Sequence, residues 1–204
     1  MKLYYSPGAC SLASHIALCE AGIAHELERV DLRTHQLADG RDYRGVNAKG
    51  YVPTLELEDG TRLTENAVVL QYIADRNPGT LAPGLGSMER YRLMEWLNFI
   101  ASEVHKGFAP LWNPAIPQEQ RNAVIRTLGT RFDYLAPFLE QRKFLTGDAF
   151  TIADAYLFAV LSWKDHLKVD LGRWPSLQGF LDRAAARPKV KEAMREENLL
   201  QQAA

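Results

Sequence analysis

The stretch "LYYSPGACSLASHIALCEAG" (residues 3–22) combines a strand pattern, a sharp break and a helix pattern, and it holds both cysteines of the chain. The apolar and aromatic residues 3–5 favour a strand, and "SPG" at 6–8 ends it. From Ser11, apolar residues recur at helical spacing until Gly22, a residue type typical of the position just beyond a helix. Cys10 is therefore predicted in the last loop residue or the first helical turn.

Two interpretations of Cys10 follow from this position. The positive end of the helix dipole favours a thiolate and would lower the pKa of the thiol from ~8.5 toward 7 or below; the alternative is a buried structural cysteine. Ala13 stands where a C-x-x-C motif has its second cysteine, which disfavours a two-cysteine disulfide exchanger. Cys19 lies roughly 13 Å further along the helix axis, so no disulfide with Cys10 is expected. Cys19 is interpreted as a small buried hydrophobe.

The composition narrows the class of protein. The length of 204 residues is enough for one large domain or two small ones. Hydrophobic residues make up 47% of the chain, which is enough for a buried core. The formal net charge of −1 gives no reason to expect nucleic acid or an anionic membrane as partner. We found no apolar run near the ~20 residues of a membrane span and no signal-peptide pattern. We therefore expect a cytoplasmic protein, and two cysteines fit a reducing compartment.

The first part of the chain alternates strands and helices. Residues 53–65, "PTLELEDGTRLTE", contain two alternating strands around Asp59-Gly60, a strong hairpin signal. Residues 33–50 are polar and irregular, with one short helix at most. The predicted order is β-α-β followed by β-β-α, with strands at 2–5 and 25–32, the hairpin at 53–65, and helices at 11–21 and 65–79. We expect an α+β unit with a mixed four-stranded sheet.

The second part of the chain is predicted to be all-helical. A Pro- and Gly-rich stretch at 78–87 is the one obvious linker, so we place one domain at 1–79, a linker at 80–86 and a second domain at 87–204. Helices are expected at 88–112, 118–142, 151–166, 176–187 and 189–197, and Pro137 is expected to bend or shorten the second of these. "TIAD" at 151–154 is a capping box that starts the third.

The motif "GYVPTLE" (residues 50–56) offers a second candidate site. Pro53 has no N–H and its preceding bond can be cis. A strand entry of this kind can leave the backbone of Val52 free to pair with an extended peptide. The alternative is a simple proline at the start of a strand.

Glu65 and Asn66 begin a predicted helix. Free N–H groups and the dipole at a helix start attract a carboxylate, while Glu65 can hold an ammonium group. The pair would therefore suit a ligand with an amino-acid end. Ordinary N-capping is the competing interpretation.

The long helix "MEWLNFIASEVHKGF" (residues 94–108) has two faces at 100° per residue. One face is apolar, and the opposite face gathers Asn98, Ser102, His105 and Lys106. A solvated outer face explains such a stripe. A face turned toward a cleft is the alternative.

Taken together, four stretches resemble the bacterial beta-class cytosolic glutathione S-transferases, most of all those found in aromatic-pollutant degradation. They are "MKLYYSPGACSLASHIALCEAG", "NAKGYVPTLELEDGTRLTENAVVLQYIAD", "ERYRLMEWLNFIASEVHKGF" and "FTIADAYLF". The resemblance covers essentially the whole chain. It implies a thioredoxin-like glutathione-binding domain, a helical domain with a hydrophobic substrate site, and a homodimer. It implies no metal and no cofactor, with glutathione as co-substrate.

The resemblance also implies roles for individual residues. Cys10, His105 and Lys106 correspond to the catalytic group beside the glutathione sulfur, and Val52, before a cis Pro53, to the residue whose backbone pairs with the cysteinyl part of glutathione. The other positions that match glutathione contacts are His35 (where many members have Lys), Tyr51, Glu65, Asn66 (where many have Ser), Asn98 and Ser102. Asn98 and Ser102 match positions that reach the ligand of the partner subunit.

Two reactions and one alternative follow from the resemblance. In conjugation, the glutathione thiolate attacks an electrophilic carbon; in disulfide exchange, Cys10 itself attacks or is glutathionylated. We expect the small hydrophobic electrophile to contact Tyr5, Phe108, Trp112 and Trp163. A non-catalytic carrier of apolar ligands on the same fold is the alternative function.

Overall fold

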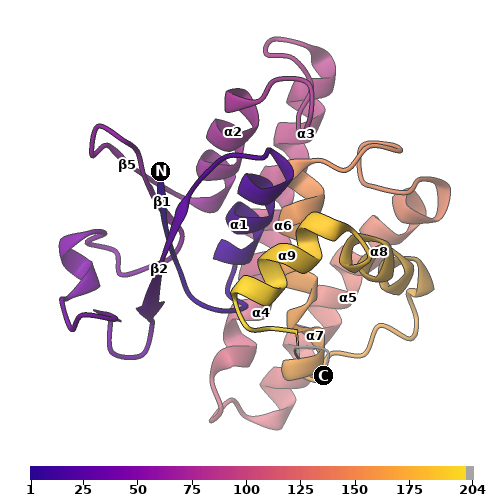
Figure 1. Cartoon of the computed structure of the whole chain (residues 1–204). Coiled ribbons are helices and arrows are strands. Elements are labelled where there is room, and N and C mark those ends of the chain that lie inside the picture. Colours follow the sequence, from indigo (N-terminus) through magenta and orange to yellow (C-terminus); the bar gives the residue numbers. More distant parts are fainter. Residues whose placement is uncertain (201–204) are drawn as a thin grey trace.

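The computed structural model describes residues 1–200 (Figure 1). The first part of the chain has the predicted order, with one additional short strand and a single turn of 3-10 helix. Its elements are β1 (Lys2–Tyr5), α1 (Ser11–Glu20), β2 (Glu26–Asp31), β3 (Gln36–Leu37), η1 (Tyr43–Gly45), β4 (Thr54–Glu56), β5 (Arg62–Thr64) and α2 (Asn66–Arg76).

The strands form one mixed sheet in the order β3-β2-β1-β4-β5. β1 pairs in parallel with β2 and antiparallel with β4, while β4 and β5 form the predicted hairpin. The predicted mixed sheet is confirmed, but it has five strands rather than four. The additional strand, β3, has only two residues and lies in the polar segment, so it is too short to show the alternation of polar and apolar residues that predicts a strand. It is defined by its pairing with Val30 and Asp31.

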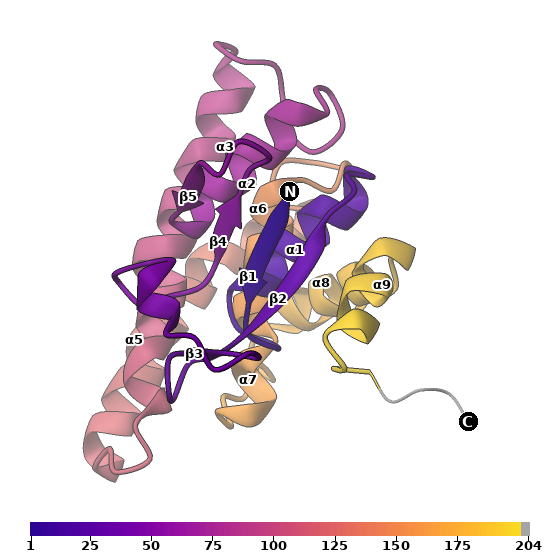
Figure 2. The same ribbon diagram turned by 60° about the vertical axis from the view of Figure 1, so that its left-hand side comes forward.

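Side chains of β1 alternate between two apolar clusters, as the period of a strand requires. Leu3 and Tyr5 join the main core, which also contains the apolar residues of α1. Tyr4 points the other way, into a small cluster with Val30, Tyr43 and Val52. Figure 2 shows β1 and β2 in front of α1, which separates the sheet from the helical part. The segment from 38 to 52 closes the outer face, and this places Val52 beside the sheet.

The second part of the chain is helical in the described residues, as predicted (Figure 1). The expected helix at 88–112 is built from four segments, one of them π-helical, and the helix at 151–166 is divided in two. The elements are α3 (Met88–Phe99), the π-helical η2 (Ile100–His105), α4 (Lys106–Phe108), η3 (Ala109–Trp112), α5 (Gln118–Gln141), α6 (Ile152–Leu161), α7 (Trp163–His166), α8 (Pro175–Ala185) and α9 (Pro188–Glu196). Pro137 lies within α5, which continues past it.

The predicted capping box at the start of α6 is confirmed. The carboxylate of Asp154 accepts hydrogen bonds from the backbone N–H and the hydroxyl of Thr151, and it also accepts the N–H of Leu145. Every residue of α6 is buried. Asp154 satisfies the N–H of the residue that caps the helix, and the N–H of Ile152 at the helix start donates to the carbonyl of Leu81. The helix can therefore start inside the core.

The two parts of the chain share one apolar core. α1 packs against α2, α6 and α9, so it contacts helices from both parts. Between α2 and α3 there is no helix or strand, which agrees with a connecting segment, although the buried Leu81 anchors it by accepting the N–H of Ile152. The limits 79/80 and 86/87 stay a prediction. Among residues 1–200 no helix has the length and apolar character that crossing a membrane requires.

Candidate active site

A cleft of about 580 Å³ lies where the two parts of the chain meet. The loop before α1, the segment 47–53, the start of α2, and residues of η2, α4, η3, α6 and α7 form its walls. Its lining residues are Ser6, Pro7, Gly8, Ala9, Cys10, Leu32, Asn47, Lys49, Tyr51, Val52, Pro53, Glu65, Asn66, Ala101, His105, Lys106, Trp112, Tyr156 and Trp163. A larger hollow of about 870 Å³ along α3 and α5 contains none of the predicted site residues, so the chemistry belongs to the smaller cleft.

Cys10 lies at the predicted junction, as the N-cap residue of α1. Both cysteines are free, as expected. The thiol of Cys10 is buried and donates a hydrogen bond to the carbonyl of Val52, with an Sγ–O distance of 3.3 Å. A thiol that donates in this way is protonated.

The expected depression of the pKa of Cys10 is wrong for this structure. Burial raises the pKa of the thiol to about 12 and outweighs the backbone N–H groups of Cys10 and Ser11 and the charge of Lys106, which all act to lower it. Cys19, which the sequence suggested is a small buried hydrophobe, has its pKa lowered: burial opposes this shift, but hydrogen bonds with His15 and His25 prevail. The helix terminus does not control the ionisation of Cys10, because the walls of the cleft bury the sulfur.

The strand entry at 51–53 has the expected geometry. The Val52-Pro53 peptide bond is cis, and Tyr51 is exposed at the rim. The carbonyl of Tyr51 accepts hydrogen bonds from Asn47 Nδ2 and the hydroxyl of Tyr43. These two bonds hold the segment against the sheet, with Val52 and Pro53 in the wall of the cleft.

His35 does not line the cleft. It adopts a positive φ of 56°, and its ring packs so closely against Gly50 that a Cβ there would lie 2.8 Å from Nδ1. The ring of His35 lies against the 47–53 segment, and its contact with a ligand stays a prediction.

Glu65 and Asn66 differ in the direction of their side chains. Glu65 has a positive φ of 66°, and its exposed carboxylate pairs with Lys49 Nζ at 2.5 Å on the cleft rim. Asn66 is buried: its amide donates to the carbonyl of Cys10 and accepts from Ser14. The side chain of Asn66 thus joins α2 to α1, and its backbone N–H at the start of α2 is the group it can offer to a ligand.

The predicted polar face of the long helix is split in the structure. His105 and Lys106 line the cleft, whereas Asn98 and Ser102 are exposed outside it and hydrogen-bond to carbonyls of their own helix. His105 lies about 10 Å further along the helix axis than Asn98, and the π-helical η2, which has more residues per turn than an α-helix, lies between Phe99 and Lys106. The projection at 100° per residue does not hold beyond Phe99.

His105 is not a cation in this cleft. Burial, with the neighbouring charge of Lys106, lowers the pKa of His105 to about 4. Its Nδ1 lies 2.8 Å from the hydroxyl of Tyr156, whose pKa burial raises well above the ordinary value. Lys106 therefore supplies the positive charge of the predicted pair, and His105 with Tyr156 supplies neutral hydrogen-bonding groups.

Two of the four expected hydrophobic contacts line the cleft. Trp112 and Trp163 form an aromatic wall with their ring centroids 5.6 Å apart. The indole N–H of Trp163 donates to the carbonyl of Gly8, which fixes that wall to the loop before Cys10. Tyr5 and Phe108 are core residues outside the cleft, because neighbouring elements cover them.

Sequence reasoning missed several polar groups of the cleft. Lys49 and Asn47 lie in the irregular segment, where no periodicity marks a functional side chain. Tyr156 lies within an apolar helix pattern, which by itself indicates core. The pairing of Lys49 with Glu65 requires contact between segments 16 residues apart, which the sequence pattern does not encode.

The arrangement can hold and activate a sulfur-containing peptide. A carboxylate and two ammonium groups lie at the rim, the Val52 backbone lies in one wall, and the N–H groups of Cys10 and Ser11 face the sulfur of Cys10. Backbone N–H groups at a helix start stabilise an anion. A thiolate brought in by a ligand would find the same donors that favour the ionised form of Cys10.

The protonated thiol of Cys10 predicts a pH profile. In a Cys19→Ser variant, alkylation of Cys10 by iodoacetamide should rise about tenfold per pH unit from pH 7 to 10, because only the scarce thiolate reacts. Mass spectrometry of quenched samples measures the rate, with Cys10→Ser as the blank. A rate that levels off near pH 7 would mean that the thiol is acidic and that burial does not control it.

Comparison with known proteins shows which family this chain is similar to. The family model "Glutathione S-transferase, N-terminal domain" matches residues 8–76, and "Glutathione S-transferase, C-terminal domain" matches residues 99–188. Glutathione S-transferase GstA of Escherichia coli O157:H7 is 47% identical over 98% of this chain and 100% of its own length. Glutathione S-transferase GST-4.5 of Xanthomonas campestris is 38% identical, over 98% of this chain and 100% of its own length.

Solved structures agree with these relatives. The ternary complex of BphK, a bacterial transferase of this type, is 53% identical, has a TM-score of 0.94 and covers 97% of this chain and 100% of its own. A sphingomonad glutathione S-transferase in complex with glutathione and the beta-class enzyme of Sphingomonas chungbukensis are each 43% identical with a TM-score of 0.93, and each covers 98% of this chain and 100% of its own. On this similarity over its full length, the chain belongs to the glutathione S-transferase family and resembles its bacterial beta class.

Proposed function

We propose that this transferase conjugates glutathione to small apolar electrophiles, with a second activity in glutathione-dependent disulfide exchange. The observation that carries the proposal is the cleft itself, which brings the Val52-Pro53 segment, Glu65 with Asn66, and Cys10 together with the aromatic wall of Trp112 and Trp163. Glutathione offers a matching peptide backbone, amino-acid end and thiol. The apolar wall supports an electrophile with an aromatic or aliphatic body.

Glutathione would bind through charge and backbone complementarity. The carboxylate of Glu65 would hold the ammonium group of the γ-glutamyl end, and the first N–H groups of α2 would donate to its carboxylate. The Val52 backbone would pair with the cysteinyl part. Lys49, already beside Glu65, and Lys106 are the cations within reach of the carboxylates of glutathione.

Conjugation would proceed through the thiolate of bound glutathione. The N–H groups of Cys10 and Ser11 and the charge of Lys106 would stabilise that anion, and the Cys10 S–H can donate a further, weak hydrogen bond. The sulfur lone pair attacks the electrophilic carbon, and the leaving group departs with its bonding electrons. His105 and Tyr156 lie beside the reacting atoms as neutral hydrogen-bonding groups.

Disulfide exchange would use Cys10 as the nucleophile. Its thiol must first lose to solvent the proton that it donates to the Val52 carbonyl, so this reaction depends on the same N–H groups and on Lys106 to stabilise the thiolate. The thiolate of Cys10 attacks one sulfur of a glutathione disulfide, forms a mixed disulfide and releases one glutathione thiolate. The buried thiol makes exchange the slower of the two proposed reactions.

We further propose a homodimer in the cytoplasm, built from a glutathione-binding unit of residues 1–79, a linker at 80–86 and a helical unit of residues 87–204. Exposed apolar side chains on and around α2 and α3 support the dimer, namely Val68, Leu85, Met88 and Tyr91. Asn98 and Ser102 lie outside this chain's own cleft, which agrees with a role toward the ligand of the partner subunit.

Glutathione binding is tested at Glu65. Glu65→Ala should weaken the affinity between several-fold and about a hundredfold, since a hydrogen bond to a charged group contributes roughly 1.5–3 kcal/mol. Isothermal titration calorimetry measures the change, and Glu58→Ala, an exposed carboxylate on the hairpin loop, is the matched control. An unchanged affinity in Glu65→Ala would contradict the assignment.

The two activities are separated at Cys10. Cys10→Ala should retain a good part of the turnover of a model aryl halide, because backbone N–H groups still hold the glutathione thiolate. It should lose the glutathione adduct formed from oxidised glutathione and most disulfide reductase activity. Both assays and intact-mass spectrometry are run on the same variant, with Cys19→Ala as control. Glutathione binding without turnover of any aryl halide in the wild type would instead favour a carrier.

The assembly is tested by light scattering. At micromolar concentration the protein should scatter as a particle of twice the chain mass, because the exposed apolar side chains of α2 and α3 are covered in a dimer. Met88→Glu together with Tyr91→Glu should shift the mass toward that of one chain. A wild type that scatters as a single chain would exclude the homodimer.

A further inference from the structure

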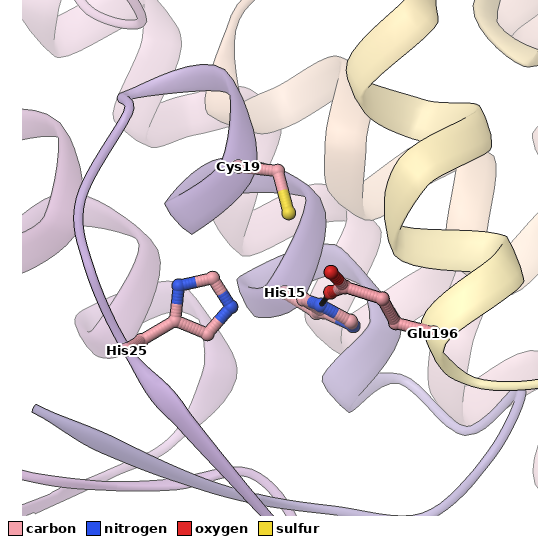
Figure 3. A group of neighbouring side chains, drawn as sticks. All are labelled: His15, Cys19, His25 and Glu196. Carbon is pink, nitrogen blue, oxygen red and sulfur yellow. Dashed lines mark hydrogen bonds and ion pairs between the residues drawn. The ribbon is translucent and has the colours of Figure 1, made fainter.

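A second group of reactive side chains lies on the far side of α1 from the cleft. Figure 3 shows the thiol of Cys19 and the rings of His15 and His25 turned toward a common centre, with the carboxylate of Glu196 reaching in from α9. One donor atom from each of the four residues lies within 4.8 Å of every other. None of the four lines the cleft.

We propose that His15, Cys19, His25 and Glu196 form a binding site for a zinc-type divalent cation, separate from the glutathione cleft. The donor set of one thiolate, two imidazoles and one carboxylate is of the kind that zinc takes in proteins. His15 and Cys19 are four residues apart in α1, so both project from one face of the helix. Calcium and magnesium prefer oxygen ligands and are poor matches.

The partners of the two imidazoles are those that a metal site requires. His15 Nδ1 lies 3.0 Å from the buried carboxylate of Glu197, and His25 Nδ1 lies 2.8 Å from the carbonyl of Ile23. When a ligating histidine donates its second N–H to a carboxylate or a carbonyl, the tautomer is fixed and the other nitrogen is presented to the metal. In both rings this leaves Nε2 for the cation.

The geometry needs a modest adjustment. Donors around a tetrahedral zinc ion are about 3.3–3.6 Å apart, given bond lengths near 2.0 Å to nitrogen or oxygen and 2.3 Å to sulfur. The widest donor separation of 4.8 Å must shorten by about 1.2–1.5 Å, whereas the His15 Nε2–Glu196 Oε2 distance of 2.8 Å must lengthen by about 0.5 Å. Glu196 is half-exposed at the end of α9, so its side chain can turn.

Solvent reaches the site, and protons compete with the cation for its donor atoms. His25 and Glu196 are reached by solvent, while His15 and Cys19 are buried behind them. The cation would take the place of protons on Cys19 and on His15 Nε2, because ligands bind a metal in their deprotonated form. Binding would tie α9 to α1 and to the start of β2, elements that are far apart in the sequence.

Cobalt(II) titration tests the proposal directly. The wild-type chain, in a buffer with a phosphine reductant and no glutathione, should develop a thiolate-to-cobalt charge-transfer band and the intense visible bands of tetrahedral cobalt, and stoichiometric zinc should abolish both. Cys19→Ser should lose the charge-transfer band. His25→Gln and Glu196→Gln should each weaken cobalt binding at least about tenfold.

Matched controls separate this site from the cleft and from misfolding. Cys10→Ser removes the other thiol, and Glu192→Gln removes a half-buried carboxylate of α9 that pairs with Lys189; both should titrate like the wild type. Circular dichroism shows whether each variant is folded, glutathione affinity does so as well for the variants outside the cleft, and Glu196→Gln provides an exposed position if Cys19→Ser does not fold. A charge-transfer band that survives in Cys19→Ser, that disappears in Cys10→Ser, or that is absent from the wild type would overturn the proposal.

Discussion

The burial of α1 on every side is the constraint on which the rest of the molecule depends. Residues 11–19 are all buried, and the helix lies between the sheet and the helices α2, α6 and α9. A helix in this position must have each polar side chain satisfied by a partner from another segment. Ser14 bonds to Asn66 at the start of α2, and His15 bonds to Glu196 and Glu197. These bonds determine where α2 and α9 lie relative to Cys10.

The electrostatics of the cleft follow from the same burial. Cys10, His105 and Tyr156 are all held in their neutral forms by the cost of charging a buried group. The charges remain at the rim, on Lys49, Glu65 and Lys106. In the proposed reaction the charges at the rim would orient glutathione, and its thiolate would need the N–H groups of Cys10 and Ser11 and the charge of Lys106 to offset the cost of burial.

Local sequence patterns predicted the features that are locally determined. The strand, break and helix around Cys10, the hairpin at Asp59-Gly60 and the capping box of Thr151 depend on neighbouring residues, and all are found in the structure. The pKa of Cys10 and the positions of Tyr5, Phe108 and His35 depend on elements distant in the sequence that cover them. The π-helical η2 lies within the polar stripe of the long helix, and the residue pattern of that stripe did not predict a π-helix.

The hydrogen bonds of Glu197 have a consequence for the order of assembly. One oxygen of this carboxylate accepts the N–H of Gly8, two residues before Cys10, and the other faces His15. During synthesis, the sheet, α1 and α2 leave the ribosome first. At that stage the chain contains the loop of Gly8 and Cys10 but not yet Glu197, which binds this loop. The hydrogen bond from Gly8 to Glu197 can form only after the chain has been synthesised past α9, so this support of the loop before Cys10 is completed late in synthesis.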